Sequence, residues 1–244
     1  MKNLTMVELF GGIGGWAVAA QMAGGIDTIA YSEIDKKKIR IYEHRHPNVP
    51  NLGDIRNIHN PPSADIYTVS FPCTDISTAG KGGGIEGEHS RLWFEAERVI
   101  GHVRPKYIVV ENSPVLTIRG FHRILAFFAS IGYNAEWMCL QGTQFGIQQY
   151  RKRLFCIAYR NKIGSQQQCT GQIFRKVEAG WGGHSTQIIF PGWANRSCVP
   201  EPRTYRSAYD VPGGIYRVAG TGDAIIPLIG MYCLVCIKRH AEQN

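Results

Sequence analysis

The sequence contains no apolar run of about 18 residues, the length that a helix needs to cross a membrane. A short strand-like segment follows the start at residues 1–4 directly, without a signal-peptide cleavage pattern. Internal repeats and low-complexity tracts are also absent. We therefore expect no membrane span, no secretory leader and no repeat architecture.

Cysteine is too sparse for a disulfide-stabilised scaffold. The 7 Cys among 244 residues are an odd number and are scattered along the chain, which fits a reducing cytoplasm. One Cys-x-x-Cys pair, Cys233 and Cys236, lies in the apolar stretch 231–237, and no second pair or His pair at zinc spacing accompanies it. We interpret both residues as core cysteines and expect no metal site.

Acidic residues are the smaller charged group. Asp and Glu number 19 against 27 Lys and Arg, which gives a net charge of +8 and favours a polyanionic partner. Hydrophobic residues make up 44% of the chain and charged residues 19%, the composition of an ordered protein. A length of 244 residues fits one α/β domain, or one with a modest insertion.

Residues 1–159 alternate short apolar runs with segments of helical periodicity, such as 92–103 and 121–131. This pattern predicts a doubly wound α/β fold, with a mostly parallel sheet covered by helices on both faces. The expected strands are Met6–Phe10, Thr28–Ser32, Ile66–Ser70, Tyr107–Glu111, Glu136–Leu140 and Leu154–Ala158.

The periodicity fades between residues 160 and 216, where Gly, Gln, Ser, Pro and Trp prevail. We interpret 160–216 as a small irregular domain. Apolar, helix-like character returns from 224 to 237, so we expect 217–244 to pack back on residues 1–159 and complete the first domain.

A glycine-rich turn at residues 11–15 joins the first strand to a helix, as in nucleotide-binding folds. Glu33 follows the second strand at the distance where a dinucleotide fold places its ribose-binding acid, and Asp54 could accept a hydrogen bond from an adenine amino group. Glycines alone could merely close a tight turn. Ala17 stands where the redox-cofactor pattern has glycine, which disfavours NAD.

A second group of residues follows later strands. Cys73 lies after the third strand, at the carboxyl edge where open α/β sheets bind ligands, and is a candidate nucleophile. Glu111 reaches the same edge and is a candidate acid, while Arg151 and Arg153 fit an anionic group. The glycine-rich residues 80–87 form either a lid or an ordinary surface loop.

Together these motifs resemble those of the DNA (cytosine-5) methyltransferases, in their prokaryotic or phage form. Residues 10–15 resemble the family's cofactor loop, and Pro72 with Cys73 its catalytic dipeptide. Residues 111–112 resemble its acid motif, 149–153 its basic motif and 222–227 its last motif. The resemblance implies a Rossmann-like methyltransferase fold, with 160–216 as the target-recognition domain.

The resemblance also implies a reaction. S-adenosylmethionine would be the cofactor and S-adenosylhomocysteine the product, with Cys73, Glu111, Arg151 and Arg153 as catalytic residues acting on a flipped-out cytosine. The implied cofactor-binding residues are Phe10, Gly12, Ile13, Gly14, Gly15, Glu33, Ile34, Asp54, Ile55, Pro72, Asp223 and Ala224. The implied substrate-binding residues are Pro72, Ser77, Asn112 and Gln149.

Three positions depart from the family pattern: Thr74 replaces the usual Gln, Ser113 the usual Val and Asp223 the usual Asn. We hypothesise that Asp223 weakens cofactor binding or changes cofactor preference. We expect the protein to bind double-stranded DNA as a monomer. Its expected location is the cytoplasm of a bacterial cell or phage-infected host, and the sequence leaves open whether a restriction enzyme accompanies it. Two alternatives stay open: a transfer RNA cytosine-5 methyltransferase, and a catalytically weak, methyltransferase-like DNA-binding protein.

Overall fold

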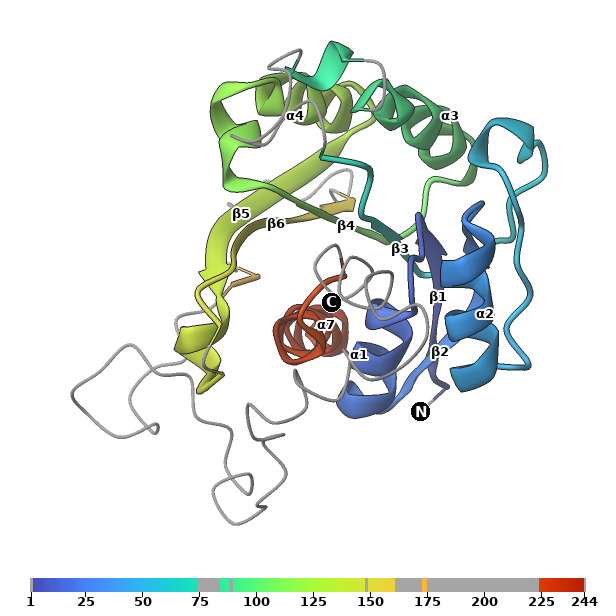
Figure 1. Cartoon of the computed structure of the whole chain (residues 1–244). Coiled ribbons are helices and arrows are strands. Elements are labelled where there is room, and N and C mark those ends of the chain that lie inside the picture. Colours follow the sequence, from blue (N-terminus) through green and yellow to red (C-terminus); the bar gives the residue numbers. More distant parts are fainter. Residues whose placement is uncertain are drawn as a thin grey trace.

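The computed structural model describes residues 2–73, 84–87, 90–147, 149–160, 173–174 and 224–243. A 6-stranded sheet in the order β2-β1-β3-β4-β6-β5 forms its centre (Figure 1). The strands span β1 Leu4–Leu9, β2 Ile26–Ser32, β3 Ile66–Val69, β4 Tyr107–Asn112, β5 Tyr133–Gln141 and β6 Lys152–Arg160. The structure thus confirms a strand at each of the expected positions.

The sheet is mostly parallel, as predicted. β1 pairs in parallel with β2 and β3, and β3 with β4, whereas β6 is antiparallel to both β4 and β5. The reversal of β6 was not predicted, because periodicity alone does not show strand direction. Its consequence is that β6 begins, rather than ends, at the edge where β1, β3 and β4 end, since Asn112 pairs with Leu154.

Helices cover both faces of the sheet (Figure 1). α1 and α7 pack on one face, and α3 and α4 pack on the other. The helices span α1 Gly15–Ala23, α2 Lys36–Arg45, α3 Trp93–Val103, α4 Phe121–Ser130 and α7 Pro227–Glu242. This arrangement is the predicted doubly wound α/β fold.

Helix α2 was not predicted, because its residues carry little apolar signal. Tyr42 is the buried residue of this helix, and its ring stacks on that of Tyr31 in β2 with 3.6 Å between centroids. The helix begins at a cap: the Asp35 side chain accepts hydrogen bonds from the backbone N–H groups of Lys37 and Lys38. One aromatic anchor and one cap therefore position a helix that is otherwise polar.

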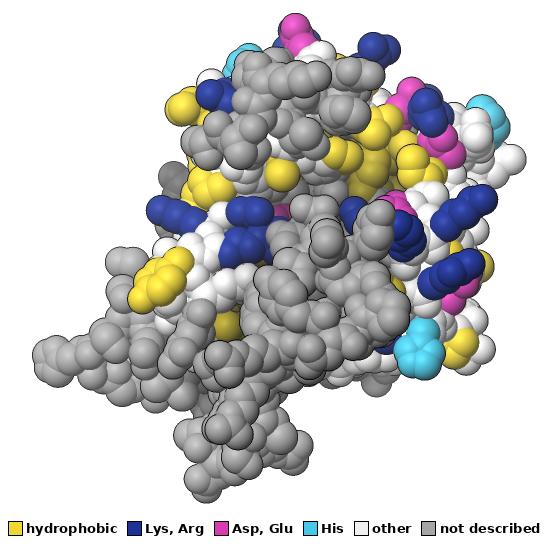
Figure 2. Space-filling model, in the orientation of Figure 1, with side chains coloured by type: hydrophobic (Ala, Val, Ile, Leu, Met, Phe, Trp, Pro, Cys, Tyr) yellow, Lys and Arg dark blue, Asp and Glu magenta, His cyan; other side chains and the backbone are white. Residues whose placement is uncertain are grey.

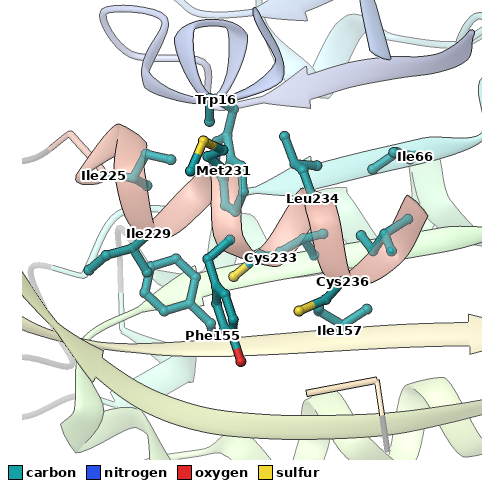
Figure 3. Packing of buried hydrophobic residues seen from close by; sticks show 14 of the residues in the cluster. Trp16, Ile66, Phe155, Ile157, Ile225, Ile229, Met231, Cys233, Leu234 and Cys236 are labelled. Atoms are coloured by element: carbon teal, nitrogen blue, oxygen red, sulfur yellow. The ribbon is translucent and has the colours of Figure 1, made fainter. Parts of the chain in front are cut away.

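The last helix returns to the first and packs very closely against it. A Cβ atom added at Gly15 in α1 would lie 2.9 Å from Ile225 Cγ1, and one added at Gly230 in α7 would lie 2.6 Å from Ile225 Cδ1. Small residues at both positions let the helices approach. Figure 3 shows α7 between Trp16 of α1 and Phe155 of β6. Residues 225–237 thus share a core with α1 and the sheet.

Cys233 and Cys236 both lie in this core, where they are 0% and 8% exposed, which confirms the interpretation of them as core cysteines (Figure 3). Burial raises the pKa of the Cys236 thiol to about 11. Ile173 and Phe174, the described residues of the expected 160–216 domain apart from Arg160, join the same core. The proposed boundaries of that domain remain a prediction. Within the described part of the chain, no helix is long and apolar enough to span a membrane.

Candidate functional site

A cavity of about 810 Å³ lies at the carboxyl edge of the sheet, where β1, β2, β3 and β4 end and β6 begins. It brings together most of the residues singled out from the sequence. Those lining it are Phe10, Gly12, Gly15, Glu33, Ile34, Asp54, Ile55, Pro72, Cys73, Glu111, Asn112, Arg151, Arg153 and Ala224.

Some expected site residues lie elsewhere. Ile13, Gly14 and Gln149 are described but do not line the cavity. Gly14 instead caps α1 in the left-handed region, with φ 85°, and a Cβ there would approach the rings of His46 and Tyr42 to 3.1 and 3.2 Å. Gly14 therefore lets the turn pack closely against the rings of Tyr42 and His46. Ser77 and Asp223 lie outside the described residues, as does Thr74.

The glycine loop presents backbone to the cavity. Gly12 has φ 58°, in the left-handed region that favours glycine, and a Cβ there would meet nothing within 4 Å. Phe10 adopts a similar φ of 60°, which is uncommon for a residue other than glycine. Its ring lies at the cavity wall. A flat ligand could lie against this ring and the open backbone beside it.

Glu33 is tied to the glycine loop and to its own turn. Its Oε2 accepts a hydrogen bond from the backbone N–H of Gly12 at 3.0 Å. Its Oε1 accepts from the N–H groups of Ile34 at 2.8 Å and Asp35 at 2.9 Å. A carboxylate has about four acceptor sites, so these three bonds orient Glu33 and leave capacity for a ligand hydroxyl.

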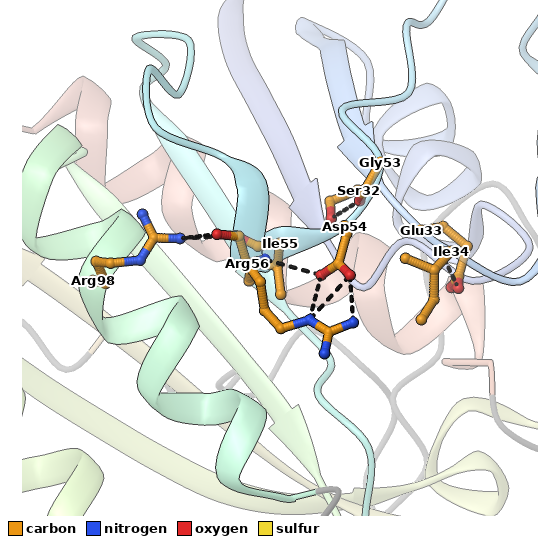
Figure 4. A network of polar contacts seen from close by, with 8 residues as sticks. All are labelled: Ser32, Glu33, Ile34, Gly53, Asp54, Ile55, Arg56 and Arg98. Carbon is orange, nitrogen blue, oxygen red and sulfur yellow. Dashed lines mark hydrogen bonds and ion pairs between the residues drawn. The ribbon is translucent and has the colours of Figure 1, made fainter.

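Asp54 begins a short 3-10 turn, η1 (Ile55–Asn57), at the same end of the cavity (Figure 4). Its carboxylate accepts from the backbone N–H of Arg56 at 3.0 Å and pairs with the Arg56 guanidinium at 2.5 Å. The hydrogen bonds from the Arg56 side chain lower the pKa of Asp54 more than burial raises it. The lowered pKa keeps Asp54 ionised at neutral pH, and a ligand donor would share its carboxylate oxygens with the backbone and guanidinium N–H groups of Arg56.

Cys73 stands half-buried at the other end of the cavity, and the backbone leading to it is fixed by two side chains. Asn112 Nδ2 donates to the carbonyl of Phe71 at 3.0 Å, and Ser90 Oγ donates to the carbonyl of Pro72 at 3.1 Å. Asn112, which was expected to bind substrate, lines the cavity, and its amide nitrogen links β4 to the segment that carries Cys73.

Glu111 and Arg153 meet because of the antiparallel register. Glu111 is paired with Phe155 across the β4 and β6 ladder, and Arg153 lies two residues before Phe155 and so on the same face. Their side chains approach to 3.4 Å between Arg153 Nε and Glu111 Oε1. With Glu111 only 4% exposed, the guanidinium supplies a charged partner for a buried carboxyl.

Arg151 has a different contact from Arg153. Its Nη1 donates a hydrogen bond to the carbonyl oxygen of Ala224, just before α7. The two arginines of the basic motif therefore both line the cavity, but one connects to the last segment and the other to the buried acid.

A further carboxyl, Glu8 of β1, lies beneath the glycine loop and was not singled out from the sequence. It is 0% exposed, and its Oε1 accepts a hydrogen bond from the Tyr42 hydroxyl at 2.6 Å. Burial raises its pKa to about 8, although the Tyr42 hydroxyl and the backbone N–H groups of Ala17 and Trp16 act in the opposite direction. The signal that could have found it is a single carboxyl within the otherwise apolar strand segment 6–9, which is buried on both faces of the sheet.

Sequence reasoning also missed several residues that line the cavity. Trp16 Nε1 donates to Ser70 Oγ at 3.1 Å and so joins α1 to the end of β3. Some of these residues are neighbours of the motifs, so extending each motif by one or two positions could have found them. The residues not singled out are Trp16, Ser32, Lys38, Arg56, Ser70, Phe71, Arg91, Leu92, Phe94 and Glu95.

Positive charge prevails around this site. Lys38, Arg56, Arg91, Arg151 and Arg153 line the cavity, and three acidic side chains besides Glu111 do so, Glu33, Asp54 and Glu95. Figure 2 shows more Lys and Arg than Asp and Glu side chains on the face seen in the orientation of Figure 1. A polyanion would be attracted to this face.

Comparison with known proteins agrees with this geometry. A sequence model of the C-5 cytosine-specific DNA methylase family matches residues 4–184. The type II methyltransferase M.HgiCII of Herpetosiphon aurantiacus is 31% identical over 171 residues, which cover 67% of this chain and 39% of that protein. The type II methyltransferase M2.ScrFI of Lactococcus lactis subsp. cremoris is 40% identical over 120 residues, 46% of this chain and 33% of that protein.

The fold also has solved counterparts. The crystal structure of the S. pombe Dnmt2 methyltransferase superposes with a TM-score of 0.55 at 24% identity, over 67% of this chain and 52% of that one. The described fold is therefore that of a known group of methyltransferases. The chain spans less than half the length of the two curated relatives, since the matches cover 39% and 33% of them.

Proposed function

This chain belongs to the C-5 cytosine-specific DNA methylase family, and from that premise we propose that it transfers a methyl group from S-adenosylmethionine to carbon 5 of cytosine in double-stranded DNA. The observation that carries the proposal is the shared cavity. It is lined at one end by Phe10, Glu33 and Asp54, and at the other by Cys73 and Glu111.

The first end of the cavity suits the nucleoside part of the proposed cofactor. Glu33 offers carboxylate oxygens to ribose hydroxyls, and Asp54 offers an ionised acceptor to an adenine amino group. The open backbone at Gly12 and the ring of Phe10 leave room for a flat base. When bound, S-adenosylmethionine supplies an electrophilic methyl group.

The other end suits attack on cytosine. Carbon 5 is a poor nucleophile until a thiolate adds to carbon 6, so we assign Cys73 to form that sulfur–carbon bond. Glu111 would stabilise the protonated ring nitrogen, which makes carbon 5 enamine-like. Once carbon 5 carries the methyl group, loss of its proton to water would restore the double bond between carbons 5 and 6 and expel the Cys73 thiolate.

The remaining residues would position these groups. Asn112 and Ser90 hold the carbonyls that precede Cys73, and Arg153 orients Glu111. Because Arg151 bonds the carbonyl of Ala224, we propose that it keeps the last segment against the cavity rather than holding the flipped nucleotide. Extruding a base from the duplex costs a few kcal/mol, which contacts to the basic face would offset.

The test is mass spectrometry of nucleosides from mixed-sequence duplex DNA incubated with the protein and S-adenosylmethionine. We expect 5-methylcytosine from the wild type, none from Cys73→Ala, and wild-type levels from Cys139→Ala, which removes a similarly half-buried cysteine outside the cavity. The same assay is run in parallel with transfer RNA as the substrate. Product on transfer RNA alone would reassign the substrate, and cofactor binding without product would favour a DNA-binding protein.

A further inference from the structure

The η1 turn that carries Asp54 lies outside the sheet, and its position is fixed by its own buried side chain, Ile55, and by side chains from neighbouring elements. On one side, Ser32 Oγ at the end of β2 donates to the carbonyl of Gly53 at 2.7 Å. In front, Arg56 pairs with the Asp54 carboxylate, but its side chain is 61% exposed, and such ion pairs contribute little to stability. A third contact is made to the backbone carbonyls of the turn.

That contact is made by Arg98 of α3 (Figure 4). Its Nη2 donates to the carbonyl of Ile55 at 2.8 Å and its Nη1 to the carbonyl of Ile58 at 2.7 Å, so one guanidinium spans the turn. Its Nε donates to Glu95 Oε2 at 2.8 Å, which orients the group from its own helix. The rigid planar fork of arginine suits two carbonyls at once, whereas lysine offers a single point charge.

The same helix is connected to the catalytic end of the cavity. α3 begins at Trp93, directly after the short 3-10 turn η3 (Ser90–Leu92), and Ser90 holds the carbonyl of Pro72. Arg98 lies further along this continuous segment. α3 therefore sets the distance between the backbone next to Cys73 and the turn that carries Asp54.

We propose that Arg98 is a positioning residue for the adenine end of the cofactor: it holds the η1 turn so that the Asp54 carboxylate meets the adenine amino group. This inference rests on the proposed function, because it assumes that an adenine nucleoside binds beside Asp54. It assigns to α3 a role in cofactor recognition in addition to covering the sheet.

The test compares two ligands that differ only at the adenine amino group: S-adenosylhomocysteine and its 6-deamino purine analogue, in which a hydrogen atom replaces the amino group and the ring nitrogens keep their roles. Calorimetric titration gives the dissociation constant of each with the wild type, Arg98→Met and Arg98→Lys. We expect the wild type to bind the adenine ligand about tenfold more tightly or better, since a hydrogen bond to a carboxylate is lost in the other. The preference should fall below about threefold in Arg98→Met and be intermediate in Arg98→Lys.

The matched control is Arg123→Met. Arg123 is also a helical arginine paired with a glutamate, Glu86, and like Arg98 it does not line the cavity, but it lies on α4 instead of α3. Arg123→Met should keep the wild-type preference. A general loss of stability in Arg98→Met would weaken both ligands equally, whereas mispositioning of Asp54 weakens the adenine ligand more, and the ratio separates the two.

Two failures can be told apart. A wild type that binds neither ligand overturns the proposed function, and this inference with it. A wild type that prefers the adenine ligand, with the same preference in Arg98→Met, overturns the role of Arg98 alone. If Arg98→Met does not fold, Arg98→Lys decides: an undiminished preference there overturns the proposal, and a reduced one supports it.

Discussion

On the cofactor side of the cavity, Glu33 is held by backbone N–H groups of its own turn and of the adjacent glycine loop. On the catalytic side, Cys73, Glu111 and Arg153 come from three separate segments and are brought together by sheet register and by Asn112 and Ser90. On the first side, the contacts of Glu33 lie within residues 12–35, whereas the turn that carries Asp54 is also bonded by Arg98 of α3. The second exists only once β3, β4 and β6 have paired.

The sharpest way to separate the two sides is Glu111→Gln. The amide keeps the shape of the side chain but cannot supply a proton as a carboxyl does, so the methylation rate should fall about 10²- to 10⁴-fold. Affinity for S-adenosylhomocysteine should stay within about twofold, because the contacts of the cofactor side are unchanged. Rate assays on duplex DNA and calorimetry check both. A parallel loss of cofactor affinity would contradict the separation of the two sides.

Glu8, the buried carboxyl beneath the glycine loop of the cofactor side, should make the free energy of unfolding depend on pH. Its pKa of about 8 in the folded protein lies above the ordinary 4.5, so the folded state holds a proton that the unfolded state has lost between these values. The stability from this group is fully present below about pH 4.5 and is lost as the pH rises towards 8.

Glu8→Gln should remove this dependence. Relative to the wild type, the variant should gain on the order of 2–4 kcal/mol in free energy of unfolding between pH 5 and pH 8. Urea denaturation across that range measures it, with Glu43→Gln, at an exposed position of α2, as the control. Parallel pH profiles for wild type and Glu8→Gln would show that Glu8 is ionised in the folded protein.

Glu33→Gln should affect binding rather than rate. An amide nitrogen would face one of the backbone N–H donors that the carboxylate now accepts from, which loosens the glycine loop. We expect the dissociation constant for S-adenosylhomocysteine to rise about 10- to 50-fold, while the rate at saturating cofactor changes little. Steady-state kinetics with varied cofactor separates the two. A fall in rate at saturation with unchanged affinity would place Glu33 on the catalytic side.

The smallest effect is expected for Asn112→Ala, which removes the link between β4 and the carbonyl of Phe71. That buried acceptor would lose its partner, at a cost of about 1–2 kcal/mol in free energy of unfolding. The rate should fall as Cys73 loses its alignment, and cofactor affinity should not. Thermal unfolding and rate assays, with Asn134→Ala on β5 as control, measure this. Unchanged rate and stability would show that the link contributes nothing.

The comparison also explains how far the sequence predicts this protein. The glycine loop, Glu33 and Asp54 were identified because their chemistry depends on short spacings in the chain. The pairing of Glu111 with Arg153 depends on β6 running antiparallel, and hydrophobic periodicity does not show strand direction. The hydrogen bond from Asn112 to the carbonyl of Phe71 was not predicted, because the sequence of an amide residue at the end of a strand is the same whether it binds a ligand or a backbone carbonyl.

α2 and Arg98 were missed for a different reason. α2 has a single buried residue, Tyr42, so no periodic apolar face marked it. Arg98 lies on a helix that was expected only to cover the sheet, and its bonds go to backbone carbonyls of residues 55–58, about 40 positions earlier. Neither feature leaves a periodic apolar signal, although the Asp35 cap is a residue-type sign of where α2 begins.

The close packing of α7 on α1 has a consequence for synthesis on the ribosome. α1 ends at Ala23 and α7 begins at Pro227. α7 must therefore leave the ribosome before it can cover the apolar side of α1 that carries Trp16 and Ala19. At 5–20 residues per second, translation takes roughly 10–40 s to add the intervening segment. During that interval the nascent chain exposes a surface that chaperones bind, so chains released before α7 should aggregate rather than accumulate in folded form.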